Sequence, residues 1–65
     1  MDKVHWEPCG NHGYIAFLNG YTLWVDRSKN GWTWEVSYYE RIADGTCRTP
    51  NGAKAAATFY AKRHP

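Results

Sequence analysis

The chain has 65 residues, enough for one domain but close to the lower limit for a core without a metal, a disulfide or a partner. Aromatic residues make up 17% of it and hydrophobic residues 43%, so the composition excludes an intrinsically disordered chain. The formal net charge of +2 is small for a dedicated nucleic-acid domain, and it permits a polyanionic partner without requiring one.

Neither a membrane span nor a secretory signal is expected. The longest apolar run, YIAFL at residues 14–18, is far too short to cross a bilayer. The first ten residues, MDKVHWEPCG, lack the apolar core of a signal peptide. We therefore expect a cytoplasmic protein in which Cys9 and Cys47 are reduced thiols, and a Cys9–Cys47 disulfide is the alternative.

The N-terminal segment differs from the rest of the chain. Residues 1–13 show no hydrophobic period and contain Pro8, Gly10 and Gly13, so we expect an irregular arm. Residues 14–65 alternate or repeat in regular patterns, without a linker or a low-complexity tract. They are expected to form a single domain.

The first hairpin is predicted around Asn19-Gly20, which lies between the runs YIAFL and YTLWVDR. This dipeptide favours a type I′ turn, because both of its positions need a positive φ. A two-residue turn sets the cross-strand pairs, which are Leu18 with Tyr21, Phe17 with Thr22 and Ile15 with Trp24. Tyr14, Ala16 and Leu18 then share one face with Tyr21, Leu23 and Val25.

The second hairpin has two possible registers. A two-residue turn at Asn30-Gly31 places Asp26 opposite Glu35, and like charges opposite one another destabilise a sheet. A four-residue loop at residues 28–31, with Gly31 left-handed, places Asp26 opposite Thr33 instead, and we prefer it. Both registers direct the alternating residues of GWTWEVSYYE to the face of the buried strand positions, so Trp32 and Trp34 are predicted to be core.

A third turn is predicted at Asp44-Gly45. Alternation then carries Ile42 to the core, and a tight turn places Cys47 opposite it on a short fourth strand.

The C-terminal segment predicts a helix. Thr49 followed by Pro50 matches an N-cap and a proline at the first helical position. Lys62, Arg63 and His64 then lie at the end where the helix dipole favours cations. One face carries a stripe of small residues and one tyrosine, namely Ala53, Ala56, Ala57 and Tyr60. The expected fold is α+β: a three-stranded, possibly four-stranded, antiparallel meander packed on one C-terminal helix.

A single helix cannot cover both faces of such a sheet. The face away from the helix is expected to carry an apolar surface, made of Ile15, Phe17 and Trp24, with Tyr39 on the same parity. Either the arm folds over this surface with Val4 and Trp6, or the surface binds a partner. We expect a non-enzymatic interaction module without a cofactor, which binds another protein or a second copy of itself.

Nucleic-acid binding by the same face is the alternative. Exposed rings stack bases, and surrounding cations hold the backbone. The candidates for these two roles are Trp24, Arg27, Lys29, Thr33, Arg41 and Arg48. Asp26 and Glu35 share this face and repel phosphate.

Four residues have side chains that bind zinc: His5, Cys9, His12 and Cys47. Their spacing lacks the paired halves of a zinc signature, so no metal site is expected. Cys9 near His12 lacks an orienting third residue, so no catalytic site is expected either.

Two resemblances cover roughly residues 14–63. A tryptophan strand, a glycine, a threonine and an alanine-rich helix follow one another, at Trp32, Val36, Gly45, Thr49, Ala53, Ala56, Tyr60 and Ala61. This order resembles plant ethylene-response-factor domains and recombinase arm-binding domains, which implies contact with the DNA major groove through Arg27, Lys29 and residues near Thr33. GTCRTPNGA at residues 45–53 is similar to the helix start of HicB-type antitoxin domains, which implies a partner-binding sheet. The chain also looks like a short bacterial or phage protein.

Overall fold

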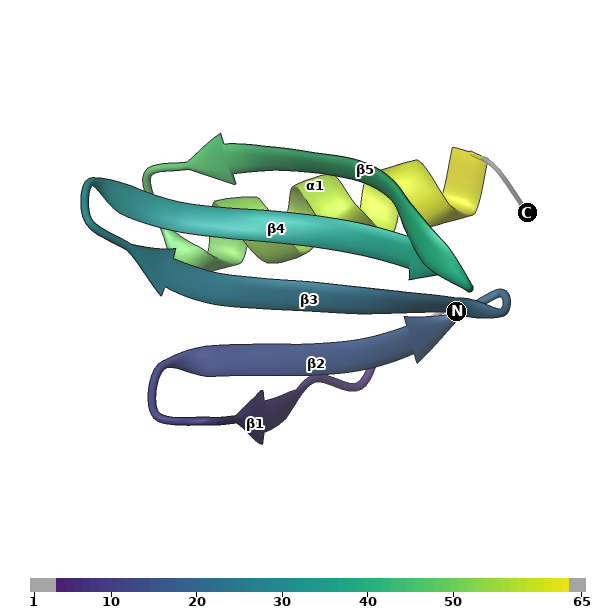
Figure 1. Cartoon of the computed structure of the whole chain (residues 1–65), viewed down its shortest axis with the longest axis horizontal. Coiled ribbons are helices and arrows are strands. Elements are labelled where there is room, and N and C mark those ends of the chain that lie inside the picture. The colour runs from purple at the N-terminus through teal and green to yellow at the C-terminus, as the bar shows by residue number, and fades with distance from the viewer. Residues whose placement is uncertain (1–3, 64–65) are drawn as a thin grey trace.

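The computed structural model describes residues 4–63, which form a five-stranded sheet and one helix. In chain order the elements are β1 (Glu7–Cys9), β2 (Gly13–Leu18), β3 (Tyr21–Ser28), β4 (Gly31–Tyr38), β5 (Glu40–Cys47) and α1 (Pro50–Arg63). All neighbouring strands are antiparallel and follow one another in sequence order (Figure 1). The α+β class, the antiparallel meander and the C-terminal helix are confirmed, whereas the prediction of three or four strands is wrong.

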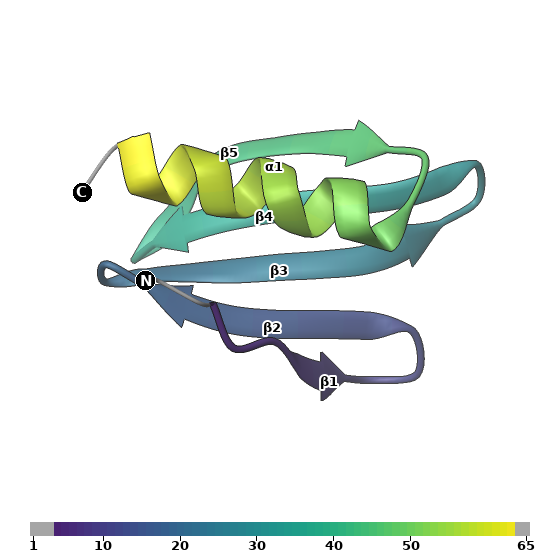
Figure 2. The same cartoon turned by 180° about the vertical axis from the view of Figure 1, so that it is seen from behind.

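Helix α1 lies across one face of the sheet, mainly over β3 and β4, as the view from behind shows (Figure 2). We call this side the helix face and the opposite side the outer face. Within residues 4–63 no helix has the length and hydropathy that a membrane span requires.

The additional strand at the N-terminal side is β1, which pairs Glu7 with Ile15 and Cys9 with Gly13. It is short and contains Pro8, which an edge strand tolerates because proline has no N–H to donate and one side of an edge strand has no neighbouring strand to receive such a bond. A strand of three residues is too short to show an alternation of apolar and polar side chains, so no pattern in the sequence indicated it.

Both predicted hairpin registers are confirmed. Asn19 and Gly20 have φ values of 55° and 84°, as a type I′ turn requires, and Leu18 lies opposite Tyr21. Asp26 lies opposite Thr33. The ladder continues to Ser28 and Gly31, however, so the loop has two residues and not the four that we expected.

The core lies between α1 and the helix face. Leu23, Val25 and Val36 are the largest fully buried side chains, and three alanines one turn apart on α1, Ala53, Ala57 and Ala61, are fully buried above them. Small side chains on the helix let its backbone approach a sheet whose own side chains are large. The stripe therefore runs at every fourth residue, and the predicted Ala56 and Tyr60 flank it, partly buried.

Local hydrogen bonds start α1 where the sequence predicts. The Thr49 hydroxyl accepts a hydrogen bond from the Gly52 N–H at 3.0 Å, and the Thr49 carbonyl accepts one from the Ala53 N–H at 3.1 Å. Lys62 and Arg63 lie in the last turn, where cations complement the helix dipole. The predicted role of His64 lies outside the described residues.

The two alternating tryptophans, Trp32 and Trp34, point to the helix face and are partly buried. Trp34 packs against the core, and the ring of Trp32 lies 6.4 Å from that of Tyr14. Their predicted orientation is confirmed, although they border the core and do not fill its centre.

The region of β5 corrects two predictions. Asp44-Gly45 is not a turn but lies within β5, and the chain reverses at Tyr39, which has a φ of 69°.

A β-bulge in β5 shifts the pairing with β4. Ser37 pairs with Arg41 and Val36 with Ala43, which leaves Ile42 as the extra residue of the bulge. The bulge changes the parity, so Ala43 takes the core position and Ile42 is 42% exposed. Cys47 lies opposite Trp32 and not opposite Ile42.

Candidate protein-interaction face

One row of side chains crosses all five strands on the outer face. The cross-strand pairs place its members in the order Glu7, Ile15, Trp24, Glu35 and Asp44, from β1 to β5. Because directly opposite residues of a sheet point to the same side, these side chains are neighbours. The row is apolar over β2 and β3, and acidic at both ends.

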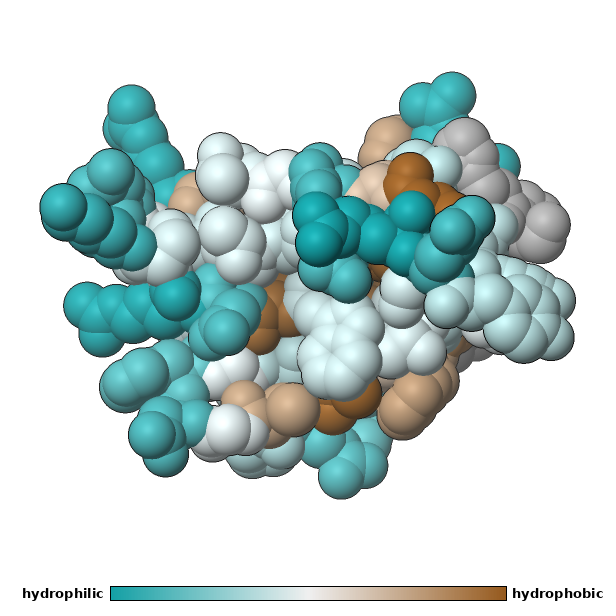
Figure 3. Space-filling model, in the orientation of Figure 1, coloured by the Kyte–Doolittle hydropathy of each residue, from teal (hydrophilic) through white to brown (hydrophobic). Residues whose placement is uncertain are grey.

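Ile15, Phe17 and Trp24 form what we call the apolar patch. Ile15 and Phe17 alternate on β2, and Trp24 lies opposite Ile15 on β3. Phe17 is 70% exposed and Trp24 37%, while Ile15 is partly buried between its neighbours. In the space-filling view of this face, brown and tan surface follows β2 (Figure 3).

The arm does not cover the apolar patch with Val4 and Trp6. Both of these residues pack against the core cluster on the other side of the sheet. The Lys54 ammonium, on α1, lies 3.7 Å from the ring centroid of Tyr14 and 5.9 Å from that of Trp6. In the part of the chain that the structure describes, no element lies over the outer face (Figures 1 and 2).

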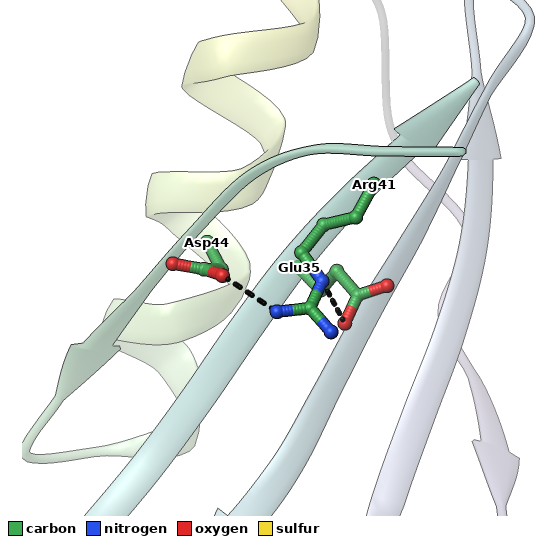
Figure 4. Close-up of polar contacts among 3 residues, drawn as sticks. All are labelled: Glu35, Arg41 and Asp44. Atoms are coloured by element: carbon green, nitrogen blue, oxygen red, sulfur yellow. Dashed lines mark hydrogen bonds and ion pairs between the residues drawn. The ribbon is translucent and has the colours of Figure 1, made fainter.

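Beside the apolar patch lies a pair of like charges held by a cation. Glu35 and Asp44 are directly opposite one another on β4 and β5, an arrangement that destabilises a sheet when it is uncompensated. The Arg41 guanidinium lies between them, with Nε 3.5 Å from Glu35 Oε1 and its Nη1 3.1 Å from Asp44 Oδ2 (Figure 4). All three side chains are substantially exposed, so the network is stabilising but screened by water.

Asp26 adds a further carboxylate to the outer face, diagonal to Glu35. Its Oδ1 accepts a hydrogen bond from the Arg27 N–H at 2.8 Å, and its carbonyl accepts one from the Thr33 hydroxyl at 3.3 Å. Among the described residues, the charged side chains in register on this face are four carboxylates and one guanidinium: Glu7, Asp26, Glu35, Asp44 and Arg41. The outer face is therefore acidic, although the whole chain has a net charge of +2.

An open hollow of about 640 Å³ lies over the acidic part of the face. Its lining includes Trp24, the three carboxylates of Asp26, Glu35 and Asp44, and the Arg41 guanidinium. The hollow brings an aromatic surface next to negative charge, which is the combination that receives a cationic group.

Tyr39 lies apart from the apolar patch, at the β4–β5 turn. It is fully exposed, and its ring meets that of Tyr38 edge-on at 4.7 Å. Tyr38 in turn meets Tyr21 at 5.8 Å. Alternation along β4 placed Tyr39 on the outer face, but the strand ends one residue before it.

The six candidates for nucleic-acid contact do not form one surface. Lys29 and Arg48 line a second hollow of about 510 Å³ between the β3–β4 turn and the end of β5. Arg27 lies near them at the end of β3. Trp24 and Thr33 are on the acidic outer face, where Arg41 is already paired with two carboxylates.

The four candidate metal ligands do not come together in one cluster: His12 lies in the β1–β2 turn and Cys47 on β5. Cys9 and Cys47 lie on β1 and β5, the two opposite edges of the sheet, and four strand spacings separate them by about 19 Å. A disulfide needs Cα atoms within about 7 Å, so the alternative of a Cys9–Cys47 bridge is wrong, and both thiols are free. His5 Nε2 instead lies 3.6 Å from Glu7 Oε2. Residues 4–63 hold no group of three or more His, Cys, Asp or Glu side chains that could bind a metal ion.

Asp44 was not predicted to lie on the outer face, because the Asp44-Gly45 dipeptide indicates a turn. A signal for the correct strand was present: Ala43, Gly45 and Cys47 alternate small residues opposite the large Val36, Trp34 and Trp32.

No protein-family model, curated protein or solved structure matches the chain. The resemblances to DNA-binding and HicB-type domains therefore rest on their sequence motifs, and the five-stranded sheet exceeds the three strands of the DNA-binding domains.

Proposed function

We propose that this chain is a small non-enzymatic interaction module, which binds a protein partner through the outer face. The observation that carries the proposal is the exposure of Phe17 and Trp24, at 70% and 37%, on a sheet face opposite the helix. Contiguous exposed apolar surface of this kind usually marks an interaction site.

The composition of the apolar patch suits this role. Aromatic side chains bury about 150–250 Å² each and supply much of the binding energy at protein interfaces, with tryptophan prominent among the residues that dominate it. The backbone under the patch is also fixed, because Leu23 and Val25, on either side of Trp24, are buried against the core. A rigid surface loses little entropy when a partner docks.

Selection from a random peptide library displayed on phage tests the proposal. We expect the wild-type chain to enrich peptides whose binding is lost in the Phe17→Ser and Trp24→Ser variants. Phe59→Ser is the matched control, because Phe59 is 60% exposed on α1, away from the sheet. Circular dichroism melts are used to check that each variant is folded.

Two results would overturn the proposal: no peptide is enriched, or the enriched peptides bind the Phe17 and Trp24 variants as well as wild type. Loss of binding in Phe59→Ser alone would assign the interaction to α1 instead.

Nucleic-acid binding is a second candidate, favoured by the position of Lys29 and Arg48 in one hollow with Arg27 nearby. It predicts retention on heparin that falls with salt and with Lys29→Gln and Arg48→Gln together. Failure of the chain to bind heparin at low salt would exclude nucleic-acid binding.

A further inference from the structure

We infer that the partner segment is cationic: it places arginine or lysine side chains over the acidic half of the outer face and apolar side chains over the apolar patch. This inference rests on the proposed function and specifies the partner's chemistry. The two halves of the face lie side by side, with the apolar patch on β2 and β3 and three of the four carboxylates, Asp26, Glu35 and Asp44, on β3 to β5 (Figure 3).

Charge is distributed unevenly between the outer face and the rest of the described chain. In register on the outer face are four carboxylates and one guanidinium among the described residues, a net charge of −3, in a chain whose total is +2. The other lysines and arginines of residues 4–63 lie elsewhere, near the β3–β4 turn and along α1. Such an asymmetry attracts a positively charged partner to this face and repels a negatively charged one.

Trp24 links the apolar half and the acidic half of the outer face. It lies directly opposite Glu35 and next to Asp26 on the same strand face, and its indole borders the open hollow. A guanidinium or ammonium group over an indole gains a cation–π interaction, and the neighbouring carboxylates accept its hydrogen bonds. Exposed carboxylates alone would suit any cation; the exposed indole and the adjacent apolar side chains favour a cationic side chain of a protein segment.

A second copy of the chain fits the face poorly. Two outer faces packed around a two-fold axis would bring a net charge of −3 against the same charge. Each copy offers one cation there, Arg41, and it already contacts Glu35 and Asp44 within its own chain. Nucleic-acid phosphates meet the same repulsion.

The strand spacing sets the span of the partner segment. From Ile15 on β2 to Asp44 on β5 there are three strand spacings, or about 14 Å. An extended segment that crosses the strands covers this span in four residues, at about 3.4 Å each. Apolar and cationic side chains four positions apart, on the same side of the segment, therefore meet the two halves together.

A designed peptide tests the inference by nuclear magnetic resonance with the ¹⁵N-labelled chain. The probe has valine at its first and third positions, arginine at its fifth and seventh, serine between them, and blocked ends. We expect it to shift the indole N–H signal of Trp24 and the amide signals of Glu35 and Asp44. Its affinity falls at least about fivefold when glutamine replaces the arginines, and falls again in about 0.5 M NaCl.

Variants of the chain locate the effect. Asp26→Asn combined with Glu35→Gln keeps the shape of the face and is expected to weaken the arginine peptide at least about fivefold. Glu40→Gln is the matched control, because Glu40 is an exposed carboxylate at the β4–β5 turn, in register with Tyr38. We expect it to change the affinity less than about twofold.

The outcomes separate this inference from the proposed function. Equal binding of the arginine and glutamine peptides at the outer face would overturn the cationic partner and leave the proposed function intact. Absence of any shift at millimolar peptide would also overturn the inference, while the phage selection decides the proposed function independently. Outer-face shifts that grow with protein concentration alone would show a second copy as the occupant, and shifts there with duplex DNA would show nucleic acid; either result overturns the inference.

Discussion

The indole of Trp34 lies over Gly45, its direct partner across β4 and β5. A Cβ atom on Gly45 would come within 2.7 Å of Trp34 Nε1 and within 2.9 Å of two carbons of the same ring. We therefore expect Gly45→Ala to lower the free energy of unfolding by about 1–3 kcal/mol, because the ring must move away from the core it packs against. Urea denaturation measures this change.

The cause is tested by a double-mutant cycle. Gly45→Ala in a Trp34→Val background is expected to cost less than in wild type, because the clashing ring is absent. Thr46→Ala, at the next and exposed position of β5, serves as the control and stays within about 0.5 kcal/mol of wild type. Equal costs of Gly45→Ala in both backgrounds would contradict a role for the Trp34 ring.

This contact explains why part of the fold was predictable and part was not. The alternation of Trp32, Trp34 and Val36 is a local signal that survives in the structure. The need for Gly45 comes from a ring eleven residues earlier in the chain, whereas the local signal of Asp44-Gly45 indicates a turn. Tertiary contact prevailed over turn propensity, and no short window of the sequence contains both partners.

The acidic part of the outer face could not be predicted fully, because of the β-bulge at Ile42. Alternation holds along β4, but one extra residue on β5 reverses the parity and moves Asp44 to the outer face, opposite Glu35. The rule against opposite like charges chose the correct register for Asp26 on β3. On β4 and β5 the same rule is overcome by Arg41, whose position depends on the turn at Tyr39. The apolar patch was predictable because its two strands have no such irregularity.

Arg41→Gln is expected to expose the repulsion between Glu35 and Asp44. Since all three side chains are exposed, the loss of unfolding free energy should be below about 1 kcal/mol and should shrink in about 0.5 M NaCl. Thermal melts at two salt concentrations measure it. The same substitution in an Asp44→Asn background should cost less, because residue 44 then no longer repels Glu35; a loss insensitive to both salt and Asp44 would contradict this account.

Ala57 fixes the distance between α1 and the sheet. It is fully buried, while Ala55 on the same helix is exposed. We expect Ala57→Leu to lower the free energy of unfolding by about 1–3 kcal/mol or more, because the larger side chain pushes the helix from β3 and β4. Ala55→Leu has the same helix propensity change and should stay within about 0.5 kcal/mol of wild type. Similar losses for both substitutions would show that propensity, and not packing, decides.

The two thiols are expected to differ in reactivity because of their positions at opposite edges of the sheet. Cys9 is exposed on the edge strand β1, while Cys47 is partly buried, with its side chain beside Gly52 at the start of α1. In the folded chain, Cys9 should therefore react faster with a thiol reagent such as dithionitrobenzoate. Under a mild oxidant the Cys47→Ser variant should still form covalent dimers, and the Cys9→Ser variant should form few. Loss of both thiols within one monomer, detected by mass spectrometry, would instead require β1 and β5 to come together and would contradict the sheet order.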